Sequence, residues 1–300
     1  MKRRKKIELF DVIVYAVLAL LTLIILYPLY FTVIASFSEP SEVVSGNVIM
    51  WFKGFNFKSY KLVFENEEIW IGYRNSIVYT LFNTIFAMIL TIPTAYALSK
   101  KYLWHRNFLT TFFVITMYFS GGMLPTYLNV KNLGLLNKPY TLIILGAFST
   151  YNMIVVKNYF ESSIPEELYE AAEMDGCSEI GKFFRIGLPL AKPVMAVIAL
   201  YYAVAKWNNY FDSLIYISNK KYYSLQMIIR NIMTQTKNAL AGIDLNIIDE
   251  QSLMDIVQRI STVETMKYAV ILIASLPMLI LYPFIQKHFV KGVMVGAVKG

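Results

Sequence analysis

Residues 163–193 read SIPEELYEAAEMDGCSEIGKFFRIGLPLAKP, a charged stretch between two long apolar segments. Ser163 precedes Glu166 by three residues, which is the spacing of a capping box at a helix start. Gly176 suits the left-handed position just past a helix end. The pattern predicts a capped helix from Ile164 to Asp175 that is held at a membrane face, and this is the character of a docking element.

The composition is that of an integral membrane protein. Of 300 residues, 57% are hydrophobic and 16% charged, and the mean hydropathy is +0.49, whereas soluble domains carry about 25% charged residues. The net charge of +8 is compatible with nucleic-acid binding, but the basic residues stand beside apolar spans, so orientation by the membrane explains them better. The single cysteine, Cys177, excludes an internal disulfide and is expected to be a small buried side chain.

Six segments are long and apolar enough to cross a bilayer as helices, which takes about 20 residues each. They lie near residues 11–37, 74–99, 108–129, 139–159, 190–216 and 266–287. With six spans, three groups of basic residues fall on one side, which marks it as cytoplasmic. These residues are Lys2, Arg3, Arg4, Lys5, Lys6, Lys100, Lys101, Arg106, Lys287 and Lys291. The sequence thus predicts an all-α membrane protein with six transmembrane helices, and with both termini and residues 163–193 in the cytoplasm.

Two further segments are predicted outside the cell. Residues 38–70 mix polar and aromatic side chains, and residues 217–265 contain a helical-looking stretch, SLMDIVQRI. The second segment also carries the acidic residues Asp244, Asp249, Glu250 and Asp255. Neither segment is long enough for an independent core. They are either surfaces for an external partner or solvated connections.

The third predicted span is irregular in its outer half. Adjacent glycines and a proline break membrane helices, and exposed backbone is tolerated only against protein or a water-filled cavity. The residues concerned are Tyr118, Phe119, Ser120, Gly121, Gly122 and Pro125. The break indicates either a translocation path or close helix packing through small residues.

The fifth predicted span, ALYYAVAKWNNYFDSLIYI, carries Lys206 well inside the membrane, where a charge costs about 2.5–3.5 kcal/mol. Helical spacing places polar side chains on one face, with Trp207 and Asn208 beside it. That face comprises Tyr202, Lys206, Asn209, Tyr210 and Ser213. The stripe is either a cluster of hydrogen bonds between helices, with Lys206 extending to the interface, or a surface that contacts a polar solute such as a sugar.

Catalytic patterns are absent from the sequence. No GxxxxGK[ST] loop is present, so the chain is not expected to hydrolyse a nucleotide alone. His105 and His288 have no Cys or His at metal-ligand spacing and are expected to be interfacial side chains. We therefore expect a non-catalytic chain with no metal and no cofactor of its own.

The opening stretch resembles the EAA loop of ABC-importer permeases. The matching residues are Glu170, Ala171, Ala172, Asp175, Gly176, Ile186, Leu188 and Pro189. The ending FVKGVMVGAVKG is similar to the tail of carbohydrate-importer permeases of the MalG type. The stretches YFSGGMLPTYL, DGC and KWNNYFDSLIYI look like the LplC/YtcP-like branch, which is associated with oligosaccharides from complex polysaccharides.

The resemblance implies a type I ABC-importer permease fold in a bacterial plasma membrane. Residues 1–70 would hold the N-terminal tail, the first helix and an extracellular segment. Residues 71–300 would form the permease core, with the coupling loop at 163–193 and an extracellular loop at 217–265. The implied partners are a homologous second permease subunit, two cytoplasmic ATPases that bind ATP and Mg, an extracellular solute-binding protein, an oligosaccharide and membrane lipid.

The resemblance implies that the EAA helix binds in a cleft of the ATPase. ATP-driven movement of that cleft would switch the permease between inward-open and outward-open states. The candidate substrate-path residues are Tyr118, Tyr202, Lys206, Trp207, Asn208, Asn209 and Tyr210. A lysine in the path would favour an acidic oligosaccharide. The rival hypothesis is an ion-coupled secondary transporter, which normally has several acidic or histidine residues inside its spans. A membrane-embedded enzyme is disfavoured because no acid–base or metal pattern is present.

Overall fold

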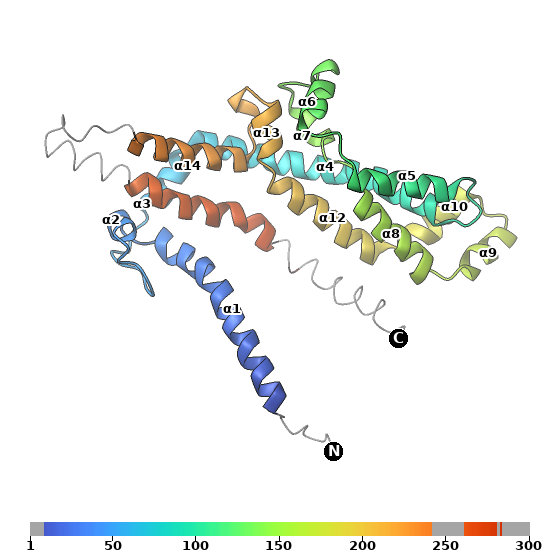
Figure 1. Cartoon of the computed structure of the whole chain (residues 1–300), viewed down its shortest axis with the longest axis horizontal. Helices are drawn as coiled ribbons and strands as arrows, with labels where there is room; N and C mark the ends of the chain where they lie inside the picture. The colour runs from blue at the N-terminus through green and yellow to red at the C-terminus, as the bar shows by residue number, and fades with distance from the viewer. Residues whose placement is uncertain (1–8, 242–260, 281–282, 284–300) are drawn as a thin grey trace. The chain divides into compact units, whose positions relative to one another are not determined.

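The computed structural model describes residues 9–241, 261–280 and 283, and in these ranges the regular structure is entirely helical (Figure 1). The chain divides into two compact units. One comprises residues 1–67 with 229–275, and the other residues 68–228 with 276–300. Several features of the sequence lie outside the described residues: the basic N-terminal run, the four acidic residues from Asp244 to Asp255, SLMDIVQRI, Lys287, His288, Lys291 and the ending FVKGVMVGAVKG.

The first unit is built around α1 (Leu9–Ser36) and the helix Ser261–Ile280 as far as Ser275. α1 is apolar on all sides, as a spanning helix should be, and the Thr22 and Thr32 hydroxyls donate to the carbonyls of Leu18 and Pro28. The hydroxyls of these two threonines are in this way satisfied within the helix.

Two short helices follow the C-terminal end of α1. They are α2 (Pro40–Val44) and α3 (Lys58–Glu65). A small core at this end contains the buried side chains of Ile34, Ala35, Val43 and Val48, with Phe31, Phe52 and Tyr268 packed against them. The buried Ser59 hydroxyl donates to Thr265 Oγ1 at 3.2 Å. α14 (Leu225–Ala241) has most of its length in this unit.

The second unit is organised along α4 (Glu67–Ser99), which Figure 1 shows beside α8 (Thr150–Ser163) and α12 (Lys192–Trp207). Its core joins these three helices through close-packed alanines and larger apolar side chains. Among them are Ala87, Ala95, Met153, Val156 and Ile198. The remaining helices are α5 (Arg106–Tyr118), α6 (Met123–Asn132), α7 (Pro139–Ile144), α9 (Glu167–Met174), α10 (Glu179–Lys182), the π-turn η1 (Phe183–Gly187), α11 (Leu188–Leu190), α13 (Phe211–Tyr216) and the 3₁₀ turn η2 (Lys220–Tyr222).

Three of the described helices are unbroken and long and apolar enough to span a membrane: α1, α4 and Ser261–Ile280. The third predicted span is divided into α5 and α6, with a bend of 111°, so the prediction of a broken helix is confirmed. A second pair, Glu179–Leu190 and α12, is bent by 78°.

The fourth predicted span, 139–159, is not one helix. Residues 145–149 interrupt it between α7 and α8. Asn83 on α4 donates to the carbonyls of Ile143 at 2.6 Å and Leu145 at 3.2 Å. An interrupted helix is tolerated inside a membrane protein when neighbouring side chains satisfy its backbone in this way.

Connections that the predicted six-span topology places on the same side of the membrane contact one another. Lys101 and Arg106 pair with Glu166 and Glu161 at one end of the second unit. At another position the Asn137 side chain accepts hydrogen bonds from the Ser218 and Asn219 amides, which joins the two connections expected outside. These contacts agree with the predicted alternation of the spans.

Candidate functional site

The EAA segment forms a short helix, α9, that starts three residues later than the sequence predicted. Ser163 is the last residue of α8, and Glu166 makes no side-chain cap for α9. The predicted capping box is therefore wrong. The reason is that Ile164, which follows α8 directly, is 6% exposed and belongs to the core. Ser163 therefore lies at the end of α8 and not at the start of α9.

The other end of α9 is as predicted. Gly176 has φ of +72°, the left-handed conformation. Its amide donates to the Glu173 carbonyl at 2.9 Å, and the Cys177 amide donates to the Ala172 carbonyl at 2.9 Å. This pair of bonds is the Schellman arrangement, which satisfies the last carbonyls of a helix. The turn at Gly176 thus ends α9 at Met174.

One side chain of α9 faces inward. Tyr169 is 7% exposed, and its ring lies 6.0 Å from that of Tyr96 at the end of α4. The Lys100 ammonium lies 3.0 Å from the centre of the Tyr169 ring and 4.7 Å from that of Tyr96. Burial lowers the pKa of Lys100 to about 8, while the two ring faces favour its charged form. Tyr169 thereby attaches α9 to the C-terminal end of α4.

A buried lysine that the sequence analysis did not single out connects α9 to α10. Lys182 is 3% exposed, and its ammonium donates to Glu173 at 2.7 Å and to Glu179 at 2.8 Å. The Tyr102 hydroxyl also donates to Glu179. The hydrogen bonds to Glu173 and Glu179 raise the pKa of Lys182, so it stays charged. We call these four residues the Lys182 network.

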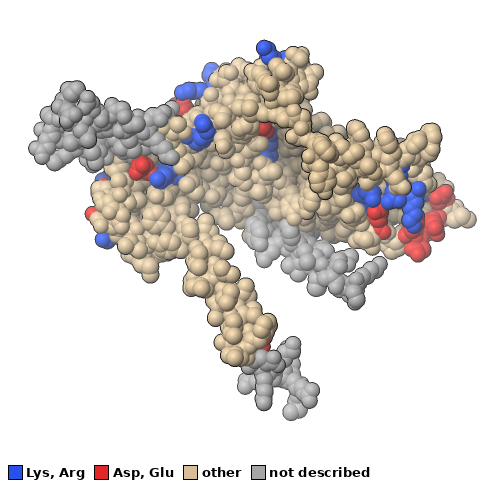
Figure 2. Space-filling view, in the orientation of Figure 1, with Lys and Arg blue, Asp and Glu red and all other residues tan. Residues whose placement is uncertain are grey.

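The Lys182 network joins three pieces of chain: the last turn of α9, α10, and the connection that follows α4. Burial alone would raise the pKa of Glu179, but hydrogen bonds from Lys182 and Tyr102 outweigh it and hold that pKa below its ordinary value. Figure 2 shows blue and red side chains gathered at the end of this unit that carries α9 and α10. The network holds α9, α10 and the α4 connection in one arrangement.

The outward face of the same segment is free of such contacts and partly apolar. Glu170, Ala171, Asp175 and Gly176 are exposed, and Ala172 is half-buried. Large apolar side chains stand out beside them: Leu168 is 44%, Met174 89%, Ile180 71% and Phe184 60% exposed. By contrast, Ile186 and Leu188 pack against the core, and Pro189 is exposed. The motif therefore divides into an outward-facing half and an inward-packed half.

The polar stripe of the fifth span is arranged differently from the prediction. α12 ends at Trp207, so Asn209, Tyr210 and Ser213 do not continue its face. The break follows from Asn209, whose side-chain oxygen accepts from the Asp212 amide at 2.9 Å, the contact that a helix-starting residue makes. The prediction of a single helical face is therefore wrong beyond Trp207.

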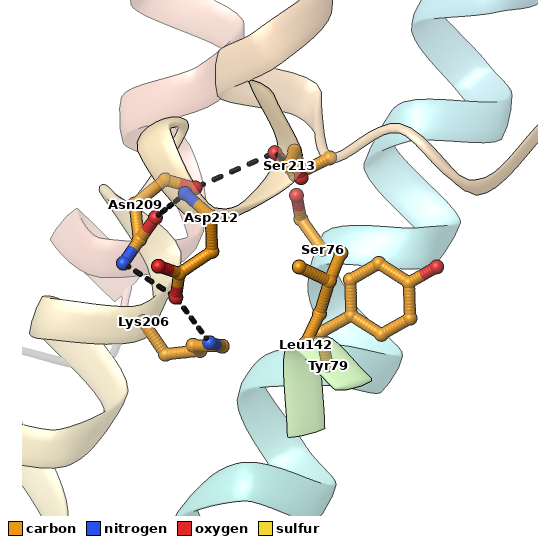
Figure 3. A pocket seen from close by; sticks show the side chains of 8 residues that line it. Ser76, Tyr79, Leu142, Lys206, Asn209, Asp212 and Ser213 are labelled. Carbon is orange, nitrogen blue, oxygen red and sulfur yellow. Dashed lines mark hydrogen bonds and ion pairs between the residues drawn. The ribbon is translucent and has the colours of Figure 1, made fainter. Parts of the chain in front are cut away.

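Lys206 is nevertheless brought to Asn209 and Ser213, because all three line one small cavity with Asp212 (Figure 3). The Lys206 ammonium donates to Asp212 Oδ2 at 3.2 Å and to the Leu145 carbonyl at 3.1 Å. Asn209 donates to the same Asp212 oxygen at 2.9 Å. The charge of Lys206 is thus balanced within the chain, and the ammonium also satisfies the interrupted backbone between α7 and α8.

The remaining candidate path residues fall into two groups. Tyr202 and Trp207 are each 3% exposed. The Tyr202 hydroxyl lies 2.7 Å from Thr91 Oγ1 and accepts from the Ser149 amide at 3.0 Å, and Trp207 packs edge-on against Tyr73. Asn208 is exposed, and Tyr118 and Tyr210 are 79% and 41% exposed.

Comparison with known proteins identifies the chain's family. The family described as binding-protein-dependent transport system inner membrane component matches residues 69–295. The chain belongs to this family. Its resemblance to ABC-importer permeases is confirmed, and so is its place in a bacterial plasma membrane.

Individual relatives of this permease family cover nearly the whole chain. Protein LplC of Bacillus subtilis (strain 168) is 38% identical over 300 residues, which is 100% of this chain and 98% of LplC. The polygalacturonan/rhamnogalacturonan transport system permease protein YtcP of the same organism is 38% identical over 98% of this chain and 100% of YtcP. The predicted similarity to the LplC/YtcP-like branch is confirmed.

A solved structure supports the same fold. One chain in the crystal structure of a bacterial ABC transporter involved in the import of the acidic polysaccharide alginate superposes with a TM-score of 0.82. It is 30% identical and covers 96% of this chain and 99% of its own length. The all-helical ABC-permease fold is therefore confirmed. Proteins of this family are membrane components of transport systems that also contain a binding protein.

Proposed function

We propose that this chain is one of two permease subunits in an ATP-driven importer, and that its cargo is an oligosaccharide derived from an acidic polysaccharide. The cargo is suggested by two relatives: the permease named for polygalacturonan and rhamnogalacturonan, and the transporter involved in alginate import. All of these polymers contain uronate sugars. The comparisons do not favour an ion-coupled secondary transporter.

The observation that carries the proposal is the outward face of α9. Glu170 and Ala171 stand exposed on a short helix whose other face is attached through Tyr169 and the Lys182 network. A helix attached firmly to the spans on one side and free on the other suits the transmission of a rigid-body movement. The exposed Leu168 and Met174 supply apolar surface for a cleft, and Glu170 supplies a carboxylate for a basic residue there.

In this account Glu170, Ala171, Ala172, Asp175 and Gly176 meet the ATPase, which alone holds ATP and Mg. Ala171 and Ala172 allow close approach, and Gly176 permits the turn. Ile186, Leu188 and Pro189 lead the chain back to α12, so that movement of α9 reaches the spans. The chain itself catalyses nothing and holds no cofactor.

For the substrate path we propose that the exposed Tyr118, Asn208 and Tyr210 contact the solute directly. Tyr202, Lys206, Trp207 and Asn209 are less exposed and would support them from within the chain, through the hydrogen bonds and ring contact described above. Aromatic faces and amide groups suit sugar rings and hydroxyls. On this proposal, selectivity for acidic sugars does not come from a free charge on Lys206.

The test is uptake into proteoliposomes that contain the chain, its partner permease and the ATPase subunits, with the binding protein outside. We expect labelled oligogalacturonide to accumulate only when ATP is inside the liposomes and binding protein is present. Vesicles that lack the ATPase subunits but carry a proton or sodium gradient are the control. Uptake in those vesicles would overturn the proposal in favour of ion coupling.

A further inference from the structure

A run of five apolar residues, VIMWF at 48–52, follows α2 in the first unit. Its two ends point inward: Val48 is 3% exposed and Phe52 packs against the same small core. The three residues between them point outward, with Ile49 58%, Met50 73% and Trp51 66% exposed. Three consecutive large apolar side chains on a protein surface indicate an interaction site.

The position of this run relative to α1 suggests what it contacts. The Tyr27 hydroxyl donates to the Ile49 carbonyl at 3.3 Å, and the Tyr30 hydroxyl donates to the Met50 carbonyl. Tyr27 and Tyr30 precede Ser36, the last residue of α1, by nine and six residues, which places them about 9–14 Å back along the helix. The run therefore folds back along α1 rather than projecting away from its end.

Tyr27 and Tyr30 lie where the edge of the bilayer is expected. A hydrocarbon core takes about 20 helical residues, and 20 residues centred on α1 end at about residue 32. Ile49 and Met50 are thus bonded to side chains within the outer part of the span. α1 is itself exposed and apolar there, with Leu26 50% and Leu29 62% exposed. The apolar surface of the spanning helix continues directly onto the run.

Aromatic rings continue the exposed apolar surface beyond Trp51. Trp51, Phe52, Phe55 and Phe57 form a chain of contacts with centroid separations of 5.1, 5.2 and 5.1 Å. Phe55 and Phe57 are more than half exposed, and Lys53 is exposed among them. Aromatic rings favour the headgroup level of a bilayer, and a lysine there can extend its ammonium to the phosphates.

We propose that Ile49, Met50 and Trp51 insert into the boundary between lipid headgroups and acyl chains, so that residues 48–57 anchor the outer end of α1 to the leaflet. The partner is a lipid surface. This assignment does not depend on the identity of the transported solute or on the ATPase contact of α9.

The experiment is fluorescence quenching of the complete transporter in liposomes made with phosphatidylcholine brominated near the headgroup or near the chain end. The signal of Trp51 is the difference between wild type and Trp51→Phe. Trp207→Phe is the matched control, because Trp207 is only 3% exposed within the chain. We expect shallow bromines to quench the Trp51 signal more than deep ones, and acrylamide in the water to leave it nearly unchanged.

Two outcomes would overturn the proposal. Quenching by acrylamide and not by brominated lipid would mean that Trp51 faces water, as a surface for a soluble partner does. Quenching by neither would mean that another subunit covers it. A nitroxide at Met50→Cys, in a Cys177→Ser chain, repeats the test without removing Trp51: oxygen dissolved in the lipid should relax it more than a water-soluble nickel complex, and the reverse order would contradict the anchor.

Discussion

The Lys182 ammonium lies 2.7 Å from the Glu173 carboxylate, and this contact joins the last turn of α9 to α10. Lys182 is buried although Glu173 is largely exposed. A charge in that position needs its partners, because a buried ammonium without them is strongly unfavourable. The contact therefore holds the outward face of α9 in a fixed orientation relative to the spans.

Replacing Lys182 should disturb this orientation without removing any residue of the docking face. We expect Lys182→Met to lower the thermal unfolding midpoint of the purified transporter and the amount of ATPase that copurifies with it. Lys101→Met is the control, since Lys101 is 75% exposed in its pair with Glu166 and exposed pairs contribute little. Equal ATPase recovery in both variants would show that the network does not position α9.

Gly176 is in the left-handed conformation. The effect of a substitution there should therefore depend on how readily the new residue adopts this conformation, and not on the size of its side chain. No atom lies within 4 Å of a Cβ built at this position, so a side chain meets no steric obstacle. A β-branched residue there costs about 1–2 kcal/mol, whereas asparagine adopts the conformation more readily. We expect Gly176→Val to reduce ATPase association more than Gly176→Asn, with membrane insertion unchanged in both. If the two variants bind the ATPase equally well, the turn is not part of the docking element.

The Lys206–Asp212 pair should behave as a unit. Lys206→Met leaves the partly exposed Asp212 carboxylate without its cation, which costs about 1–3 kcal/mol. We expect the double variant Lys206→Met, Asp212→Asn to recover much of this loss in thermal unfolding.

Transport by the same variants shows whether Lys206 has a structural role or selects acidic sugars by its charge. Because Asp212 balances the charge, the ratio of acidic to neutral oligosaccharide uptake should be the same in the double variant and in wild type. A selective loss of acidic sugar uptake would instead assign Lys206 to the solute path as a charge.

Lys100 gives the protein a specific pH dependence. Burial lowers its pKa to about 8 in the folded state, below the unfolded value of about 10.4. Between these values the folded state has released the proton while the unfolded state still holds it, so stability should rise as pH increases from about 8 to about 10.4. This rise should be smaller in Lys100→Met.

The pKa of Lys101 is shifted in the opposite direction from that of Lys100, so its effect on stability has the opposite pH dependence. The hydrogen bond to Glu166 raises the pKa of Lys101, so its contribution is present below the unfolded pKa and is lost as pH rises through the folded one. Lys101→Met should therefore retain the rise in stability that is reduced in Lys100→Met. Identical pH profiles of unfolding in wild type and Lys100→Met would contradict the assignment.

The sequence was informative where one local rule determines the structure. Gly176 ends α9 as its residue type predicts, and Gly121 and Gly122 stand at the break between α5 and α6. Gly122, with φ of +86° and ψ of 174°, adopts a conformation that is essentially restricted to glycine. The spacing of the EAA residues was equally specific, and the family match confirms the permease class that it indicated.

The errors arose where a local pattern competed with a tertiary contact or with a second local pattern. Ser163 and Glu166 have capping-box spacing, but core packing of Ile164 extends α8 through Ser163. Asn209 and Asp212 have the same three-residue spacing, and this signal could have revealed the break after Trp207. The apolar character of the whole segment favoured one continuous helix instead.

Other features could not be obtained from one sequence. Tyr102 meets Glu179 across 77 positions, and Lys100 meets Tyr169 across 69. Such pairings depend on how α4, α9 and α10 pack, which no periodicity within one segment specifies. Hydropathy predicts six spans, and the described residues contain three unbroken spanning helices and two bent pairs. The interruption of 139–159 depends on Asn83 and Lys206 satisfying its backbone.

Site-directed photo-crosslinking can show whether α9 contacts the ATPase. A benzoylphenylalanine at position 174, where Met174 is 89% exposed, should crosslink to the ATPase subunit in the complete transporter. The same group at position 210, where Tyr210 is 41% exposed near the Lys206 cavity, should not. Absence of an ATPase adduct from position 174, or equal adducts from both positions, would contradict the account.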